Sequence, residues 1–224
     1  MVLASSGPVN GRVVVIDPGH NGANQSHPQE INRQVPAGNG KTKSCDTTGT
    51  ATDAGYPEYA FSMDVALRVA AILRQHRVTV ILTRSDSSGV GPCVDRRAQI
   101  GNDAHAAAAI SIHADGAPAA DYGYHVIWPS PSDKNAAIVD ASHALAIHVR
   151  DYFKADSGEP ISTYVRSGLT QRGDLAGLNL STVPKVFIEC ANMRNAGDAA
   201  RITAGAWRQK AAQGIADGLL AFIR

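Results

Sequence analysis

Residues 12–20, RVVVIDPGH, join an apolar run rich in β-branched side chains to a turn. The run is apolar without alternation, which predicts a strand buried on both faces, and the pair Pro18-Gly19 ends it. Asp17 and His20 therefore stand at the carboxyl end of a buried strand. Open α/β sheets bind their ligands at that end of their strands, so this stretch indicates a fold class and a candidate site together.

Further strands and helices alternate along the chain. The patterns predict strands over residues 78–84, 108–113, 123–128 and 185–190. Apolar residues at helical spacing predict helices over 57–75, 95–102, 138–152 and 207–222, while residues 155–183 are ambiguous and have room for one strand. This alternation predicts a single α/β domain, with a twisted, mostly parallel sheet of about six strands flanked by helices.

The composition is that of a globular chain without a polyanionic partner. Of the 224 residues, 44% are hydrophobic and 18% are charged, which suits one folded domain. The formal charge of +1 gives no reason to expect nucleic acid. No apolar run is long enough to span a membrane. We expect a monomer with a flexible N-terminal segment at residues 1–11 and one domain over 12–224.

A long connection interrupts the pattern at residues 18–57. It is rich in Gly, Asn, Thr, Gln and Pro and has no sustained period. Most connections in compact domains have about 4–6 residues, so a segment of this length is expected to be a functional loop or to be ordered by another part of the chain.

Two of the three cysteines lie in polar, irregular stretches. Cys45 is in the long insert, and Cys93 follows a Gly- and Pro-rich segment. A disulfide between them would contribute on the order of 4 kcal/mol in the chain-entropy model and would fix the insert; the alternative is that both are reduced. Cys190 follows an apolar strand and is expected to be a buried free thiol.

A disulfide favours an oxidising compartment. The N-terminal residues do not form a signal peptide, having neither a basic cluster nor an apolar core. We therefore expect a secreted, periplasmic or cell-wall protein whose leader is absent from this sequence.

Two histidines and a glutamate are candidate metal ligands. His20 and His113 follow or end predicted strands, and Glu58 begins a predicted helix. Two imidazoles and one carboxylate form a ligand set of catalytic zinc, with a further position left to water. Because the three are far apart in sequence, spacing alone is weak evidence, and structural histidines are the alternative.

Other carboxylates could take part in this site. Glu30 in the insert is an alternative ligand, while Asp17 and Asp115 flank the histidines and could orient them. Glu189 is unusual because it lies inside the apolar run 185–190, where a carboxylate is costly unless it is paired or faces a site. It is either a catalytic group or the partner of a buried Arg. His125 could face the site or solvent. No GxSxG or GxxxxGK[ST] motif occurs.

Four motifs in order carry a family resemblance: VIDPGH at 15–20, Glu58 with DVALR at 64–68, SIHAD at 111–115 and PKVFIE at 184–189. They resemble the motifs of the zinc-dependent N-acetylmuramoyl-L-alanine amidases of the amidase-3 type. The resemblance covers nearly the whole chain from residue 12. The long insert and the cysteine pair are similar to those of the secreted, single-domain mycobacterial members.

The resemblance implies an amidase catalytic domain over residues 12–224 in which His20, Glu58 and His113 hold Zn²⁺ and Glu189 transfers protons. It implies hydrolysis of the amide between N-acetylmuramic acid and L-alanine in peptidoglycan stem peptides, with muropeptides as partners and a role in cell-wall degradation and cell division. Asp115, Arg172 and Asn192 are expected to bind substrate. Two alternatives are a zinc peptidase that cuts within the stem peptide and a non-catalytic cell-wall-binding module.

Overall fold

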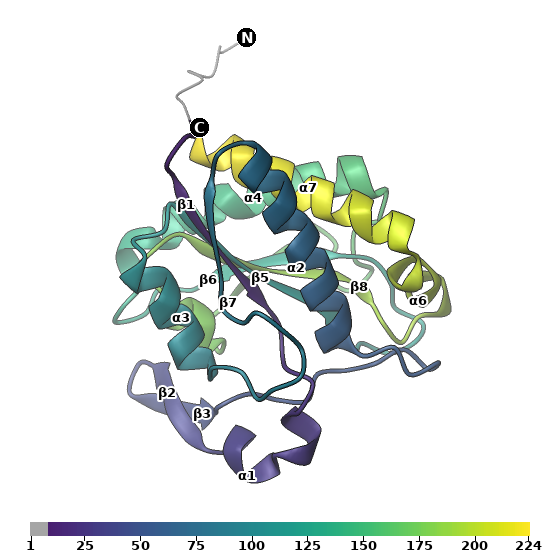
Figure 1. Cartoon of the computed structure of the whole chain (residues 1–224), viewed down its shortest axis with the longest axis horizontal. Coiled ribbons are helices and arrows are strands. Elements are labelled where there is room, and N and C mark those ends of the chain that lie inside the picture. The colour runs from purple at the N-terminus through teal and green to yellow at the C-terminus, as the bar shows by residue number, and fades with distance from the viewer. Residues whose placement is uncertain (1–8) are drawn as a thin grey trace.

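The computed structural model describes residues 9–224, and residues 1–8 of the expected flexible segment lie outside this range. A six-stranded sheet has the order β4-β1-β5-β8-β6-β7 (Figure 1). The strands are β1 (Val13–Pro18), β4 (Thr79–Leu82), β5 (Ala108–Asp115), β6 (His125–Pro129), β7 (Leu169–Arg172) and β8 (Lys185–Asn192). β4, β1, β5 and β8 are parallel, whereas β6 runs antiparallel to β8 and parallel to β7. The expected mostly parallel α/β sheet is confirmed.

Helices cover both faces of this sheet (Figure 1). One face carries α2 (Glu58–Gln75), α4 (Val139–Ser157) and α7 (Gly205–Ile223), with α7 packed between the other two. The opposite face carries α3 (Val94–Asp103) and α5 (Ala176–Asn179). Gly214 and Gly218 allow the backbones of α7 and α4 to approach closely, since a Cβ at either position would lie 2.7 Å from a Cα atom of α4. No helix of the described chain is both long and apolar enough to cross a membrane.

Alternation along the central strands separates two cores. Ile16, Ile112 and Ile188 belong to the large core beneath α2, α4 and α7, whereas Val15 and Ala109 belong to a small cluster on the α3 face. Because side chains alternate with a period of two, the α3 face also receives a polar series at the carboxyl ends of the strands: Asp17, Ser111, His113 and Glu189. The apolar strand β8 thus carries its carboxylate toward a site rather than into the main core.

The neighbour of Glu189 points the other way. Cys190 is fully buried in the large core and is a free thiol, as expected. Burial raises the pKa of this thiol well above its ordinary value, and the charge of Glu189 adds to the effect.

The insert at 18–57 is more ordered than its composition predicts. It contains the short helices η1 (Asn24–Ser26) and α1 (Pro28–Ile31) and a hairpin of β2 (Gln34–Gly38) and β3 (Lys41–Ser44). Gly38, Asn39 and Gly40 form the hairpin turn, with φ values of 83°, 54° and 70°. An Asn-Gly pair predicts a hairpin when alternating hydrophobic residues flank it on both sides. Here the flanking segments lack that alternation, so the sequence does not reveal the hairpin. A further unpredicted helix, α6 (Ala196–Thr203), begins after Asn195, whose side chain accepts from Gly197 and Asp198 N–H groups.

Candidate metal centre and catalytic cleft

His20, Glu58 and His113 meet at the carboxyl end of the sheet. They come from the turn after β1, the first residue of α2 and the end of β5. One donor atom from each lies within 4.8 Å of the others. The Glu58 carboxylate stands between the two rings, with Oε2 3.2 Å from His20 Nε2 and Oε1 2.9 Å from His113 Nδ1. The structure therefore brings together the three candidate metal ligands.

The local backbone explains this convergence. His20 adopts a left-handed conformation, with φ of 58°, which turns its side chain back over the end of β1. Gly19 leaves the space that the His113 ring occupies, because a Cβ at this position would lie 2.3 Å from Cε1 of that ring. Backbone N–H groups of Thr50 and Ala114 donate to the Glu58 carboxylate over 3.0 and 3.3 Å. Position 19 is therefore restricted to glycine by the ligand arrangement itself.

The electrostatics of this cluster favour a cation. Burial alone would raise the pKa of Glu58, but the charge and hydrogen bonds of the two histidines hold it well below its usual range. Burial opposes protonation of His20, yet Glu58 and Asp46 outweigh it and raise the pKa of His20 to about 10. The cluster thus has a strong preference for positive charge. Imidazole and carboxylate donors fit Zn²⁺.

Glu189 lies next to the cluster across the sheet. In the strand register it is opposite His113 of β5 on one side and His125 of β6 on the other. It lines a cleft together with residues of the cluster, of the insert and of strands β5 and β8: His20, Thr48, Gly49, Glu58, His113, Asp115 and Phe187. Burial raises the pKa of Glu189 well above its ordinary value, and the negative charges of Glu58 and Asp115 add to this. The alternative of a structural pair with Arg is not favoured, since Arg172 forms its ion pair with Asp174 instead.

The three expected substrate residues occupy different places. Asp115 lines the cleft and accepts a hydrogen bond of 2.6 Å from the Tyr164 hydroxyl. Arg172, at the end of β7, is partly exposed and forms a bidentate pair with Asp174 outside the cleft lining. Asn192 is fully buried, and its side chain binds the carbonyls of Pro118 and Asp121, so it shapes the loop beside the cleft.

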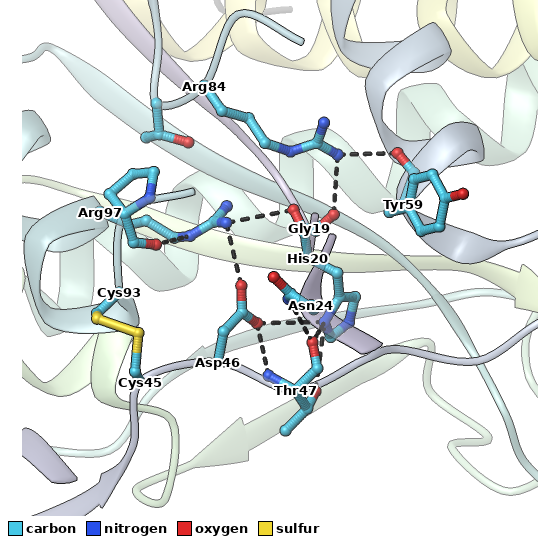
Figure 2. Close-up of polar contacts among 12 residues, drawn as sticks. Gly19, His20, Asn24, Cys45, Asp46, Thr47, Tyr59, Arg84, Cys93 and Arg97 are labelled. Atoms are coloured by element: carbon cyan, nitrogen blue, oxygen red, sulfur yellow. Dashed lines mark hydrogen bonds and ion pairs between the residues drawn. A yellow bond between two sulfur atoms is a disulfide. The ribbon is translucent and has the colours of Figure 1, made fainter. Parts of the chain in front are cut away.

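The carboxylate next to His20 is not Asp17, which its position at the end of the strand predicts. Asp17 does not reach a histidine; it is buried and pairs with Arg97 over 2.9 Å, which holds the pKa of Asp17 far below its usual range against the effect of burial. Asp46 of the insert takes that place, with Oδ1 3.3 Å from His20 Nδ1 (Figure 2). Glu30 is exposed on α1, away from the cluster. Asp46 has no local sequence signal, because its approach depends on how the insert folds.

His125 is also a residue whose side the sequence leaves open. It is buried, its ring centroid is 5.5 Å from that of Tyr164, and burial lowers its pKa to about 4. It therefore stands as a neutral imidazole on the far side of Glu189 from the cluster.

A doubly covered α/β sheet with two imidazoles and a carboxylate beside a separate glutamate fits the class of hydrolases that use a metal ion. Residues 14–221 match the family model described as N-acetylmuramoyl-L-alanine amidase, and the chain belongs to this family.

Individual relatives agree with this assignment. The chain is 43% identical over 223 residues to the N-acetylmuramoyl-L-alanine amidase Rv3717 of Mycobacterium tuberculosis, covering 98% of this chain and 90% of the relative. The crystal structure of the amidase Ami1 from Mycobacterium smegmatis superposes with a TM-score of 0.91 at 44% identity, covering 97% of this chain and 99% of that one. The crystal structure of the apo form of Ami1 from Mycobacterium abscessus superposes with a TM-score of 0.90 at 46% identity, covering 96% of this chain and 100% of that one.

Proposed function

We propose that the protein is a zinc-dependent amidase that cleaves the bond between N-acetylmuramic acid and L-alanine in peptidoglycan stem peptides. The observation that carries this proposal is the His20–Glu58–His113 cluster beside Glu189, in a chain that belongs to the amidase family. His20, Glu58 and His113 would hold the metal.

When bound, Zn²⁺ supplies Lewis acidity, which polarises a carbonyl and makes water more acidic. Glu189 would accept a proton from the attacking water at a carboxylate oxygen while the water oxygen bonds to the lactyl carbonyl carbon. It would then donate this proton to the L-alanine nitrogen as the carbon–nitrogen bond breaks. The products are a free lactyl carboxyl group and a free peptide amino group. The raised pKa of Glu189 suits a residue that must act as base and acid in turn.

We also propose that the chain acts as a monomer outside the cytoplasm, as a secreted, periplasmic or cell-wall protein. The Cys45–Cys93 disulfide supports this, since such bonds persist in oxidising compartments. Cell-wall degradation during cell division is the process that this activity would serve.

Mass analysis of the products from a defined muropeptide, with and without a chelator, tests the function. The expected products are N-acetylmuramic acid with a free lactyl carboxyl and an intact stem peptide beginning with L-alanine, formed only without the chelator. Cleavage between amino acids of the stem would favour the zinc peptidase. Binding of the muropeptide without any product would favour a cell-wall-binding module.

A further inference from the structure

We propose that Asp46 is a positioning residue that orients His20 toward the metal, and that Arg97 and the Cys45–Cys93 disulfide hold Asp46 in place. The inference rests on the proposed function, because it concerns the same metal centre. It assigns the long insert a part in metal affinity, in addition to its place in the cleft wall.

The first step concerns the two nitrogens of His20. Nε2 faces Glu58 and the cluster. Nδ1 faces the insert, 3.3 Å from Asp46 Oδ1 and 3.1 Å from the Thr47 carbonyl oxygen (Figure 2). Two acceptors at Nδ1 place the proton of the neutral ring there and leave the lone pair of Nε2 free for a cation. A carboxylate or carbonyl behind a metal-binding histidine fixes the ring orientation and raises its basicity.

Asp46 controls both of these acceptors. Its Oδ1 atom contacts the ring directly and also accepts the N–H of Thr47 over 2.8 Å, which holds the backbone of the residue whose carbonyl contacts the ring. The buried Asn24 side chain donates to that same carbonyl over 2.7 Å. Loss of the Asp46 carboxylate therefore removes one partner of His20 and loosens the other.

Arg97 fixes the other oxygen of Asp46. This buried guanidinium donates to Asp46 Oδ2 over 3.2 Å and to Asp17 Oδ1 over 2.9 Å. It also donates to the carbonyl oxygens of Pro18 and His20, over 2.7 and 3.2 Å. One side chain of α3 thus joins the insert to the end of β1, from which His20 emerges.

The disulfide joins the insert covalently to the start of α3, the helix that carries Arg97 (Figure 2). Cys45 directly precedes Asp46, and Cys93 lies four residues before Arg97, at the start of α3. The Val94 N–H donates to the Cys45 carbonyl over 2.8 Å, so the backbones are also joined at this point. The disulfide lies next to Asp46 in the insert and one helical turn before Arg97 in α3, so it limits how far these two side chains can separate. It thereby keeps Asp46 within reach of Arg97 and His20.

His113 is supported in a different way, which makes the inference specific to His20. Its ring stacks on Phe187 with centroids 5.3 Å apart and an interplanar angle of 12°. The metal centre therefore has one ligand oriented by a charged network of the insert and one oriented by aromatic packing in the sheet.

The zinc dissociation constants of Asp46→Ala and Asp46→Asn test this inference, measured by competition with a chromophoric chelator. We expect about 10- to 100-fold weaker binding for Asp46→Ala, the usual effect of losing an outer partner of a metal ligand. Asp46→Asn keeps an oxygen for the His20 ring but loses an acceptor for Arg97, so a smaller loss is expected. The absorption spectrum of the cobalt-substituted protein should change in Asp46→Ala, since a reoriented imidazole alters the ligand field.

Asp53→Ala is the matched control. Asp53 lies in the same insert and pairs with Arg194 over 3.0 Å, but this pair is exposed and does not touch the cluster. It should bind zinc like the wild type. An unchanged dissociation constant in folded Asp46 variants, or an equal loss in the control, would overturn the inference alone. A wild-type protein that binds no zinc would instead overturn the proposed function and this inference with it.

Discussion

At the scale of single residues, the proposed mechanism gives two carboxylates different tasks, metal binding for Glu58 and proton transfer for Glu189. Glu58 is the first residue of α2 and lies between two imidazoles, which lower its pKa. Glu189 is buried on β8 beside like charges, and burial together with these charges raises its pKa. Two carboxylates whose environments move their pKa values apart are typical of sites that divide binding from proton transfer.

The Glu189→Gln variant tests this division. We expect it to bind stoichiometric zinc, because Glu189 is not in the three-residue cluster. Its kcat should fall by at least about 100-fold, the usual contribution of a general acid–base group. Metal analysis and initial rates on a muropeptide give both values. Wild-type turnover by the zinc-loaded variant would remove Glu189 from the mechanism.

At the same scale, the sequence predicts the residues that stand at strand and helix ends. His20, Glu58, His113 and Glu189 are visible because polar side chains follow or interrupt apolar runs. Asp46 is not visible in this way. Its neighbours are set by a hairpin, a disulfide and an arginine from a distant helix, and no local pattern encodes these contacts.

At the scale of elements, the central strands follow directly from their apolar runs, while the short elements do not. β1, β5 and β8 are buried on both faces, so apolar side chains mark most of their length before the polar residues at their carboxyl ends. β2, β3 and α6 depend on turn and cap residues, with few buried side chains to reveal their period. β4 ends at Leu82, before the expected residue 84, although the Thr83 N–H still donates to the Ile16 carbonyl of β1 over 3.1 Å and its hydroxyl donates to Asp17 over 2.6 Å.

The disulfide between the insert and α3 should stabilise the whole domain. Cys45 and Cys93 are 48 residues apart, and closing such a loop lowers the entropy of the unfolded chain by up to about 4 kcal/mol in free energy. We expect the double variant Cys45→Ser/Cys93→Ser to melt several degrees lower than the wild type, in a thermal scan with a chelator present. An unchanged Tm would show that the covalent link adds nothing to the packing of the insert.

Two buried carboxylates, Glu159 and Asp198, share the Arg201 guanidinium where α6 meets the end of α4. This arrangement makes stability depend on pH. Glu159, just after α4, binds Arg201 of α6 over 2.6 and 3.0 Å, and Arg201 also pairs with Asp198. Burial raises the pKa of Glu159 from 4.5 to about 7, with the Asp198 charge adding to it and Arg201 opposing it. The folded state then binds more protons than the unfolded state, so this contribution to stability is lost as the pH rises from about 4.5 through about 7.

Glu159→Gln should remove this dependence. The amide stays neutral at every pH. The free energy of unfolding of the variant relative to the wild type should therefore rise between pH 5 and pH 8 by on the order of 1–2 kcal/mol, which corresponds to several degrees in Tm. Melting curves at a series of pH values measure the difference. The exposed Glu30→Gln should show no such trend. A constant difference between Glu159→Gln and wild type across the series would contradict the assignment.

At the scale of the whole molecule, the candidate metal centre is built from both sides of the sheet. Glu58 comes from a helix of the large-core face, while His113 and Glu189 project on the α3 face. A bound cation would therefore stabilise the fold as a unit. Binding at 1,000 times the dissociation constant contributes about 4 kcal/mol, which corresponds to a Tm shift on the order of 10 °C for a domain of this size.

Chelator treatment measures this coupling. The wild-type protein should melt at a lower temperature in the presence of the chelator than with zinc. His113→Ala lacks one of the three proposed ligands and should respond far less. If the chelator leaves the Tm of the wild type unchanged, the metal does not contribute to global stability.

The burial of Cys190 makes this residue a natural reporter of unfolding. The thiol lies in the central strand β8, directly behind Glu189, and it is the chain's one free cysteine. Because it is fully buried and its pKa is raised, a thiol reagent can reach it only when the sheet opens. The rate at which a soluble alkylating reagent labels this position therefore reports how often the sheet beneath the candidate site opens, without any added probe.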